Sequence, residues 1–155
     1  MKRREASAAI LMTLLLGACA SAKQTVQHVE GARPKQVCIA EHQAVRPEFL
    51  QALQEAYRKN GIETRVMDGT YELRDNRWYT KWKSQDARGC EALGFYVANW
   101  HWDVGNYMRF ANIWMVTPDG KKRLGGASYQ AGTGPDKFIN ARDKVFELVD
   151  QMLAP

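Results

Sequence analysis

Two histidines are the residues of this chain whose positions suggest acid–base chemistry. His101 and Asp103 stand two residues apart at the end of a β-prone run and could act as an acid–base pair. His42 follows the first expected strand, at a sheet edge where the sites of α/β proteins often lie. No nucleophile elbow, metal-ligand spacing or pair of carboxylates accompanies them. Catalysis is therefore the weakest function hypothesis, and no metal or cofactor is expected.

Cysteine chemistry has clearer sequence support. Residues 2–4 are basic, residues 8–16 form an apolar run, and Leu16-Gly17-Ala18-Cys19 closes it. This order is typical of a bacterial lipoprotein signal peptide (1–18) whose lipobox ends at Cys19, the residue that receives the acyl chains. A nine-residue apolar helix spans about 13 Å, which is too short to cross a bilayer. The alternative is an ordinary signal peptide with a coincidental cysteine.

The residues around the cleavage point also indicate a destination. No Asp follows Cys19, so by resemblance to enterobacterial lipoproteins we expect the outer membrane, facing the periplasm. Loss of residues 1–18 removes three basic residues and one acidic residue, which lowers the formal net charge from +5 to +3. Such a mild charge suits an anionic surface and does not indicate nucleic acid binding.

The two other cysteines form an even pair once Cys19 is assigned to lipid. In an oxidising compartment this predicts a disulfide between Cys38 and Cys90. Two buried thiols or a redox pair are the alternatives. The redox pair is the weakest of these, because neither cysteine belongs to a C-x-x-C motif.

The elements that position these residues are expected in one domain over residues 36–155, behind a flexible tether (19–35) of roughly 20–25 Å. The order β-α-β-β-β-β-α predicts an α+β two-layer sandwich. It has a mainly antiparallel four- to five-stranded sheet with two helices on one face. Strands are expected at 36–40, 62–66 and 123–130, and helices at 47–59 and 138–153.

Residues 93–103 and 106–117 are expected to form a long hairpin. With Val104-Gly105 as the loop, the numbers of facing residues sum to 209. One face is assigned to the helix-covered core and carries the pairs Trp102/Tyr107, Trp100/Arg109, Ala98/Ala111 and Tyr96/Ile113. The other face exposes Phe95, Phe110 and Trp114, a candidate partner or ligand surface. The alternative is that both faces are covered.

Residues 69–89 interleave basic side chains with aromatic ones, among them Trp78, Tyr79 and Trp82. Such a segment can bind a glycan, anionic lipid headgroups or a protein. The favoured alternative is a long loop or extra hairpin whose aromatic rings lie back on the domain.

Several blocks of the chain resemble a known family. Val37-Cys38-Ile39, the run 96–103 (YVANWHWD), Tyr107-Met108 and the run 137–141 (KFINA) resemble the Sbal-type family of small proteobacterial lipoproteins. The resemblance covers roughly residues 36–153. It implies cysteines at the positions of Cys38 and Cys90, and it makes 69–89 an insertion. The family carries no established activity, so the resemblance transfers no functional residues.

Together these features predict a lipid-anchored, periplasm-facing envelope lipoprotein that acts as a protein-binding or structural module. Its expected partners are the membrane, through the lipid, and an envelope protein or a glycan. The alternatives are a glycan- or lipid-binding module that uses residues 69–89, and a small hydrolase that uses His101 and Asp103.

Overall fold

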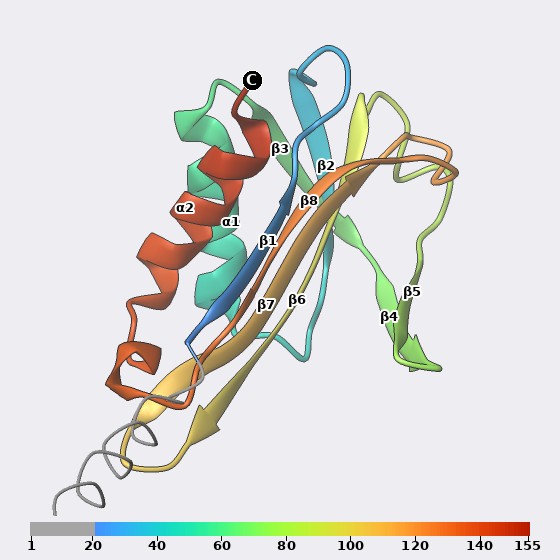
Figure 1. Ribbon diagram of the computed structural model, residues 1–155. Coiled ribbons are helices and arrows are strands. Elements are labelled where there is room, and N and C mark those ends of the chain that lie inside the picture. Colours follow the sequence, from blue (N-terminus) through green and yellow to red (C-terminus); the bar gives the residue numbers. More distant parts are fainter. Residues whose placement is uncertain (1–20) are drawn as a thin grey trace, which may run out of the picture.

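The computed structural model describes residues 21–155, so the predicted signal peptide, the predicted lipobox and Cys19 lie outside the described residues. The chain belongs to the α+β class, as predicted (Figure 1). Its elements, in order, are β1 (Lys23–Gln27), β2 (Gln36–Glu41), α1 (Pro47–Lys59), β3 (Glu63–Asp68), β4 (Thr70–Arg74), β5 (Arg77–Lys81), β6 (Ala92–Trp102), β7 (Asn106–Val116), β8 (Arg123–Gln130), the 3-10 helix η1 (Pro135–Lys137) and α2 (Ala141–Leu153).

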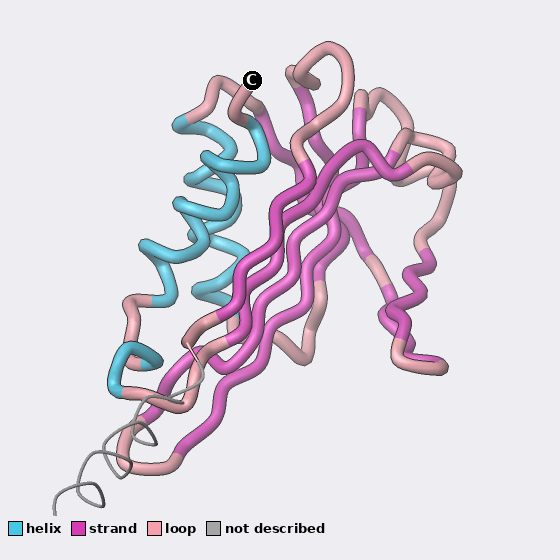
Figure 2. Tube along the Cα trace, viewed as in Figure 1, coloured by secondary structure: helices cyan, strands magenta, loops and turns pink. Residues whose placement is uncertain are grey.

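The main sheet has six strands in the order β1-β8-β7-β6-β2-β3, and β4 pairs with β5 in a separate hairpin (Figure 2). The pairs β1-β8, β8-β7 and β7-β6 are antiparallel. Strand β2 is parallel to both of its neighbours, β6 and β3. The predicted four- to five-stranded, mainly antiparallel sheet is therefore corrected to a mixed, six-stranded one. The parallel pairing of β2 with β3 follows from the crossover through α1, since a helical connection returns the chain in the same direction.

The prediction of a flexible tether over 19–35 is wrong for the residues that form β1. Lys23 to Gln27 pair residue by residue with Gln130 to Gly126 of β8. The chain then stays attached, because the Val29 N–H donates to the Met152 carbonyl at 2.9 Å. The ordered domain thus begins near residue 23 rather than at residue 36.

Both helices cover one face of the sheet, and the β4-β5 hairpin lies on the other side (Figure 1). Pro47 occupies the first turn of α1, as expected, and Gly61 ends the helix with a φ of +75°. Asn140 caps α2 by accepting the N–H groups of Arg142 and Asp143. The main core fills the space between helices and sheet, with Leu53, Tyr57, Tyr96, Ile113, Leu148 and Val149 fully buried.

The long hairpin follows the predicted register up to Asn99, where Ala98 faces Ala111 and Tyr96 faces Ile113. The register then shifts by one, and Trp100 faces Met108, so Arg109 becomes the extra residue of a β-bulge. The loop accordingly holds three residues instead of two.

Two residues assigned to the helix-covered core are exposed. Trp102, at the end of β6, is 71% exposed, and Arg109 on β7 is also exposed. The cation over the Trp100 ring is Arg46, at 4.6 Å from the ring centroid.

Candidate functional site

The helix-free face of the sheet is covered, so the predicted open surface there is wrong. Phe95 is 1% exposed, Trp114 is buried and Phe110 is half-buried. Trp82 packs on Phe95 with ring centroids 5.3 Å apart, and Trp114 lies 5.7 Å from Phe95. The covering layer is the segment that leaves β3 at residue 68 and returns to β6 at residue 92. This corresponds to the alternative in which both faces are covered.

The disulfide between Cys38 and Cys90 is present, as predicted. Cys38 lies on β2 inside the sheet, and Cys90 stands just before β6, with the two Cα atoms 5.7 Å apart. Arg65 on β3 donates to the carbonyls of Asp86 and Arg88 at 2.7 and 2.8 Å. The bond and the arginine together fasten the returning end of the covering segment to the sheet.

His42 fastens the other end of that segment. Its ring stacks on Tyr71 with centroids 4.1 Å apart, meets Trp78 edge-on, and approaches the Tyr96 carbonyl through Nδ1 at 3.3 Å. The Tyr71 hydroxyl donates to the Ala40 carbonyl at 2.7 Å. Burial lowers the pKa of His42, although the bond to Tyr96 opposes this shift. The imidazole packs among the rings of Tyr71, Trp78 and Tyr96, and it acts as a packing element of this layer.

His101 and Asp103 do not form the acid–base pair that their spacing allows. Asp103 makes an ion pair with Lys137 and accepts the Val104 N–H, and these bonds lower the pKa of its carboxyl group. His101 is exposed, and its ring meets Tyr107 at 5.9 Å between centroids. Because the carboxylate is bound by Lys137, this pair gives the hydrolase hypothesis no support.

The aromatic side chains of residues 69–89 mostly lie back on the domain. Trp78 and Trp82 are half-buried, and Trp82 also lies against Gly120 in the turn that follows β7. Tyr79 is exposed, with the Arg74 guanidinium 6.0 Å from its ring centroid. Of the three predicted aromatic residues, Tyr79 alone is exposed, at 47%.

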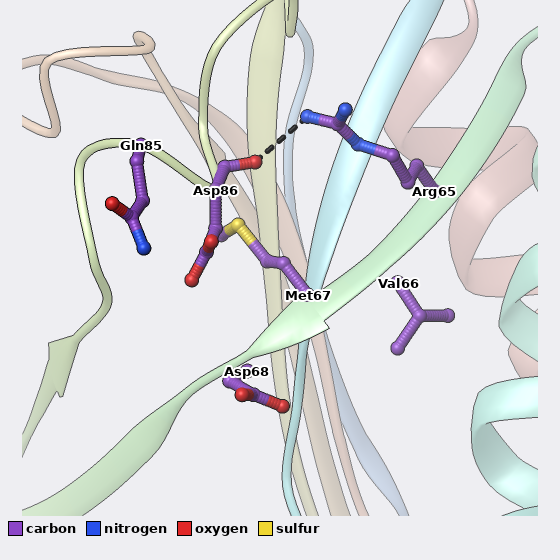
Figure 3. Close-up of a pocket in the computed structure, with 6 residues that line it drawn as sticks. All are labelled: Arg65, Val66, Met67, Asp68, Gln85 and Asp86. Carbon is purple, nitrogen blue, oxygen red and sulfur yellow. Dashed lines mark hydrogen bonds between the residues drawn. The ribbon is translucent and has the colours of Figure 1, made fainter.

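The structure adds a groove that sequence reasoning missed, at the free edge of β3 (Figure 3). It measures about 390 Å³ and is lined by Arg65, Val66, Met67, Asp68, Gln85 and Asp86. Within residues 21–155, β3 pairs with β2 alone, so its other side carries backbone N–H and C=O groups without a strand partner. Figure 3 shows Arg65 reaching across the groove to Asp86, while Val66 points away on the other side of the strand. Val66 is 39% exposed. The alternating run 62–66 predicted a strand but carried no sign that this strand ends the sheet.

A second cavity, of about 200 Å³, lies between the starts of α1 and α2. Arg46, Phe49 and Trp100 line one part of it, and Arg142 lines another. Arg142 is already engaged in an ion pair with Glu55. This cavity is small, and its two cations already have partners: Arg46 lies over the Trp100 ring and Arg142 pairs with Glu55.

Within residues 21–155, no helix is long and apolar enough to cross a membrane. Over the same residues, no three His, Cys, Asp or Glu side chains are grouped so that they could hold a metal ion.

Comparison with known proteins relates the chain to solved structures by fold. No protein-family model matches the chain, and no curated protein matches its sequence. Its fold is similar to that of a PelC dodecamer from Paraburkholderia phytofirmans, with a TM-score of 0.55 and 10% identity over 84% of this chain and 94% of that one. A single-residue variant of the same dodecamer aligns with a TM-score of 0.52 and 9% identity, over 86% and 94% of the two chains. At this identity the likeness establishes a shared fold.

Proposed function

We propose that this chain is a lipid-anchored module of the bacterial cell envelope that faces the periplasm and acts by binding another protein chain. The lipobox at Leu16-Gly17-Ala18-Cys19 supports the anchor and the outer-membrane destination. The disulfide supports the compartment, since such bonds persist in oxidising environments such as the periplasm.

The observation that carries the binding role is the free edge of β3 beside its groove. An exposed edge strand can add a strand from another chain, with main-chain hydrogen bonds giving affinity and the flanking pockets giving selectivity. The groove supplies such flanking positions, which are lined by Met67, the guanidinium of Arg65 and the carboxylates of Asp68 and Asp86.

A second copy of this chain is the partner that we propose first. The sheet ends in two different free edges, β1 and β3. A copy that sets β3 against the β1 of its neighbour makes a head-to-tail contact, and such contacts close into rings when the rotation allows. The two PelC structures with this fold are dodecamers, which supports testing self-association before other protein partners.

The glycan- or lipid-binding alternative through residues 69–89 has less support. Binding of a sugar by stacking needs open aromatic faces, and of Trp78, Tyr79 and Trp82 only Tyr79 is exposed, at 47%.

The anchor is tested by expressing the full chain and its Cys19→Ser variant in a Gram-negative host. We expect the wild type in the outer-membrane fraction, with a mature mass that includes the acyl chains. The variant should leave that fraction, because more than one acyl chain is what makes anchoring stable. Ser21→Ala is the matched control and should behave as the wild type. A wild-type chain recovered without acyl chains would contradict the anchor.

The edge is tested with Val66→Lys in the full lipidated chain. A lysine on an edge strand opposes strand addition, so we expect the wild type to sediment as an oligomer and the variant as a monomer in density-matched detergent. Leu73→Lys, at a 56% exposed position on β4, is the matched control and should remain oligomeric. A monomeric wild type, or a variant that associates as the wild type does, would count against the β3 edge.

A further inference from the structure

Exposed apolar side chains gather at one end of the molecule. Trp102 is 71% exposed and Val104 is 89% exposed, both at the turn between β6 and β7, and Phe138, after η1, is 45% exposed. Large apolar groups so open to water cost free energy unless another phase covers them. We call these three residues and their turn the hairpin tip.

The hairpin tip is held as one unit with η1. The Phe138 ring packs edge-on against Tyr107, 5.6 Å away, and lies so near Gly105 that a Cβ there would come within 3.1 Å. Lys137 makes an ion pair with Asp103 and stands 5.0 Å from the Tyr107 ring centroid. The apolar groups are therefore presented by an ordered scaffold, which reduces the entropy lost on binding.

The sheet register places the start of β1 on the same side as the hairpin tip. Lys23 pairs with Gln130, which pairs with Phe110, which pairs with Asn99, so these four residues form one row across the sheet. β6 continues for three residues beyond that row, or about 10 Å. From Lys23 onward, β1 runs away from the hairpin tip. Figure 1 shows the start of β1 and the turn between β6 and β7 at the same end of the molecule.

The lipobox cysteine is tied closely to that end. Cys19 precedes Lys23 by four residues, and a chain of that length spans at most about 14 Å. A bilayer that holds acyl chains on Cys19 must therefore come within this distance of Lys23, at the end of the sheet where the hairpin tip projects.

We propose that the hairpin tip inserts into the interface of the same bilayer that holds the lipid anchor, so that the domain stands on the membrane with a fixed orientation. This proposal rests on the proposed lipid anchor. Tryptophan favours the headgroup region, where its ring is half in hydrocarbon and half in contact with water. The exposed cation Arg109 lies on β7 near the turn, and the exposed Lys23 starts β1 at the same end of the sheet. Cations near an anionic surface add to membrane binding.

The test uses a fluorophore at Val104. In the lipidated full chain Cys19 is acylated and Cys38 is bonded to Cys90, so Val104→Cys supplies a single thiol for an environment-sensitive dye. The labelled protein is reconstituted into vesicles of phosphatidylethanolamine and phosphatidylglycerol. We expect a blue-shifted emission and strong quenching by lipids brominated near the top of the acyl chain. Leu73→Cys with the same dye is the matched control and should keep the emission seen in water, because β4 is remote from the hairpin tip.

Equal emission and quenching at the two positions would overturn the proposal while leaving the anchor in place. Failure of the anchor has a different signature, namely two dyes per chain, since an unacylated Cys19 would also react. That outcome would overturn the anchor and, with it, the insertion of the hairpin tip.

Discussion

Loss of the disulfide between Cys38 and Cys90 is expected to lower the free energy of unfolding by about 4 kcal/mol. The bond closes a loop with a sequence separation of 52, and the chain-entropy model assigns about this amount to a loop of that size. A domain of this length has a total stability of roughly 5–15 kcal/mol, so the loss is a large share of it. The segment that the bond fastens covers the helix-free face, and that layer should loosen first.

The measurement is urea denaturation of the full chain with and without a reductant, followed by tryptophan fluorescence. The Cys38→Ala/Cys90→Ala double variant should resemble the reduced wild type and should not respond to reductant. This comparison separates the bond itself from any loss of packing at the two buried positions. A wild type whose urea midpoint does not move on complete reduction would contradict the prediction.

Truncation of Phe95 should cost about 3–5 kcal/mol, the usual range for a buried phenylalanine replaced by alanine. Phe95 lies between β6 and the covering segment, with the rings of Tyr71, Trp82 and Trp114 at 6.3, 5.3 and 5.7 Å between centroids. A Phe95→Ala variant would leave a cavity among these rings that the rigid sheet cannot close.

The same experiment distinguishes a covered face from an open one. On an open partner surface the substitution would change stability by well under 1 kcal/mol, as most surface substitutions do. Tyr79→Ala, at an exposed position of the same covering segment, is the matched control and should show that small effect. A Phe95→Ala variant as stable as the control would mean that the covering segment does not pack on the sheet in solution.

Several elements could be predicted from the sequence because their signals are local. α1 has Pro47 in its first turn and Gly61 after its end, and its buried residues recur at helical spacing. β8 occupies 123–130, as expected. The facing pairs of the long hairpin were predictable as far as Asn99, since alternation over many residues sets the register.

Elements without a local pattern could not be predicted in this way. The run KQTVQ of β1 is polar and short, and it becomes a strand because β8 offers a row of backbone partners. The bulge at Arg109 and the exposure of Trp102 at the end of β6 likewise have no local signal in the sequence.

By itself the sequence determined the α+β class, the strand–helix–strand unit that becomes β2, α1 and β3, and the pairing of Cys38 with Cys90. The first two depend on residue types and spacings within short segments. The pairing follows from the number of cysteines once Cys19 is assigned to lipid. The tertiary structure decided which surfaces remain open. Phe95 and Trp114 are buried because residues 69–89 fold back over them, while Val66 and Trp102 are exposed because no segment within residues 21–155 covers them. Burial is a competition among segments distant in sequence, so the free edge of β3 and the hairpin tip became visible only in the folded chain.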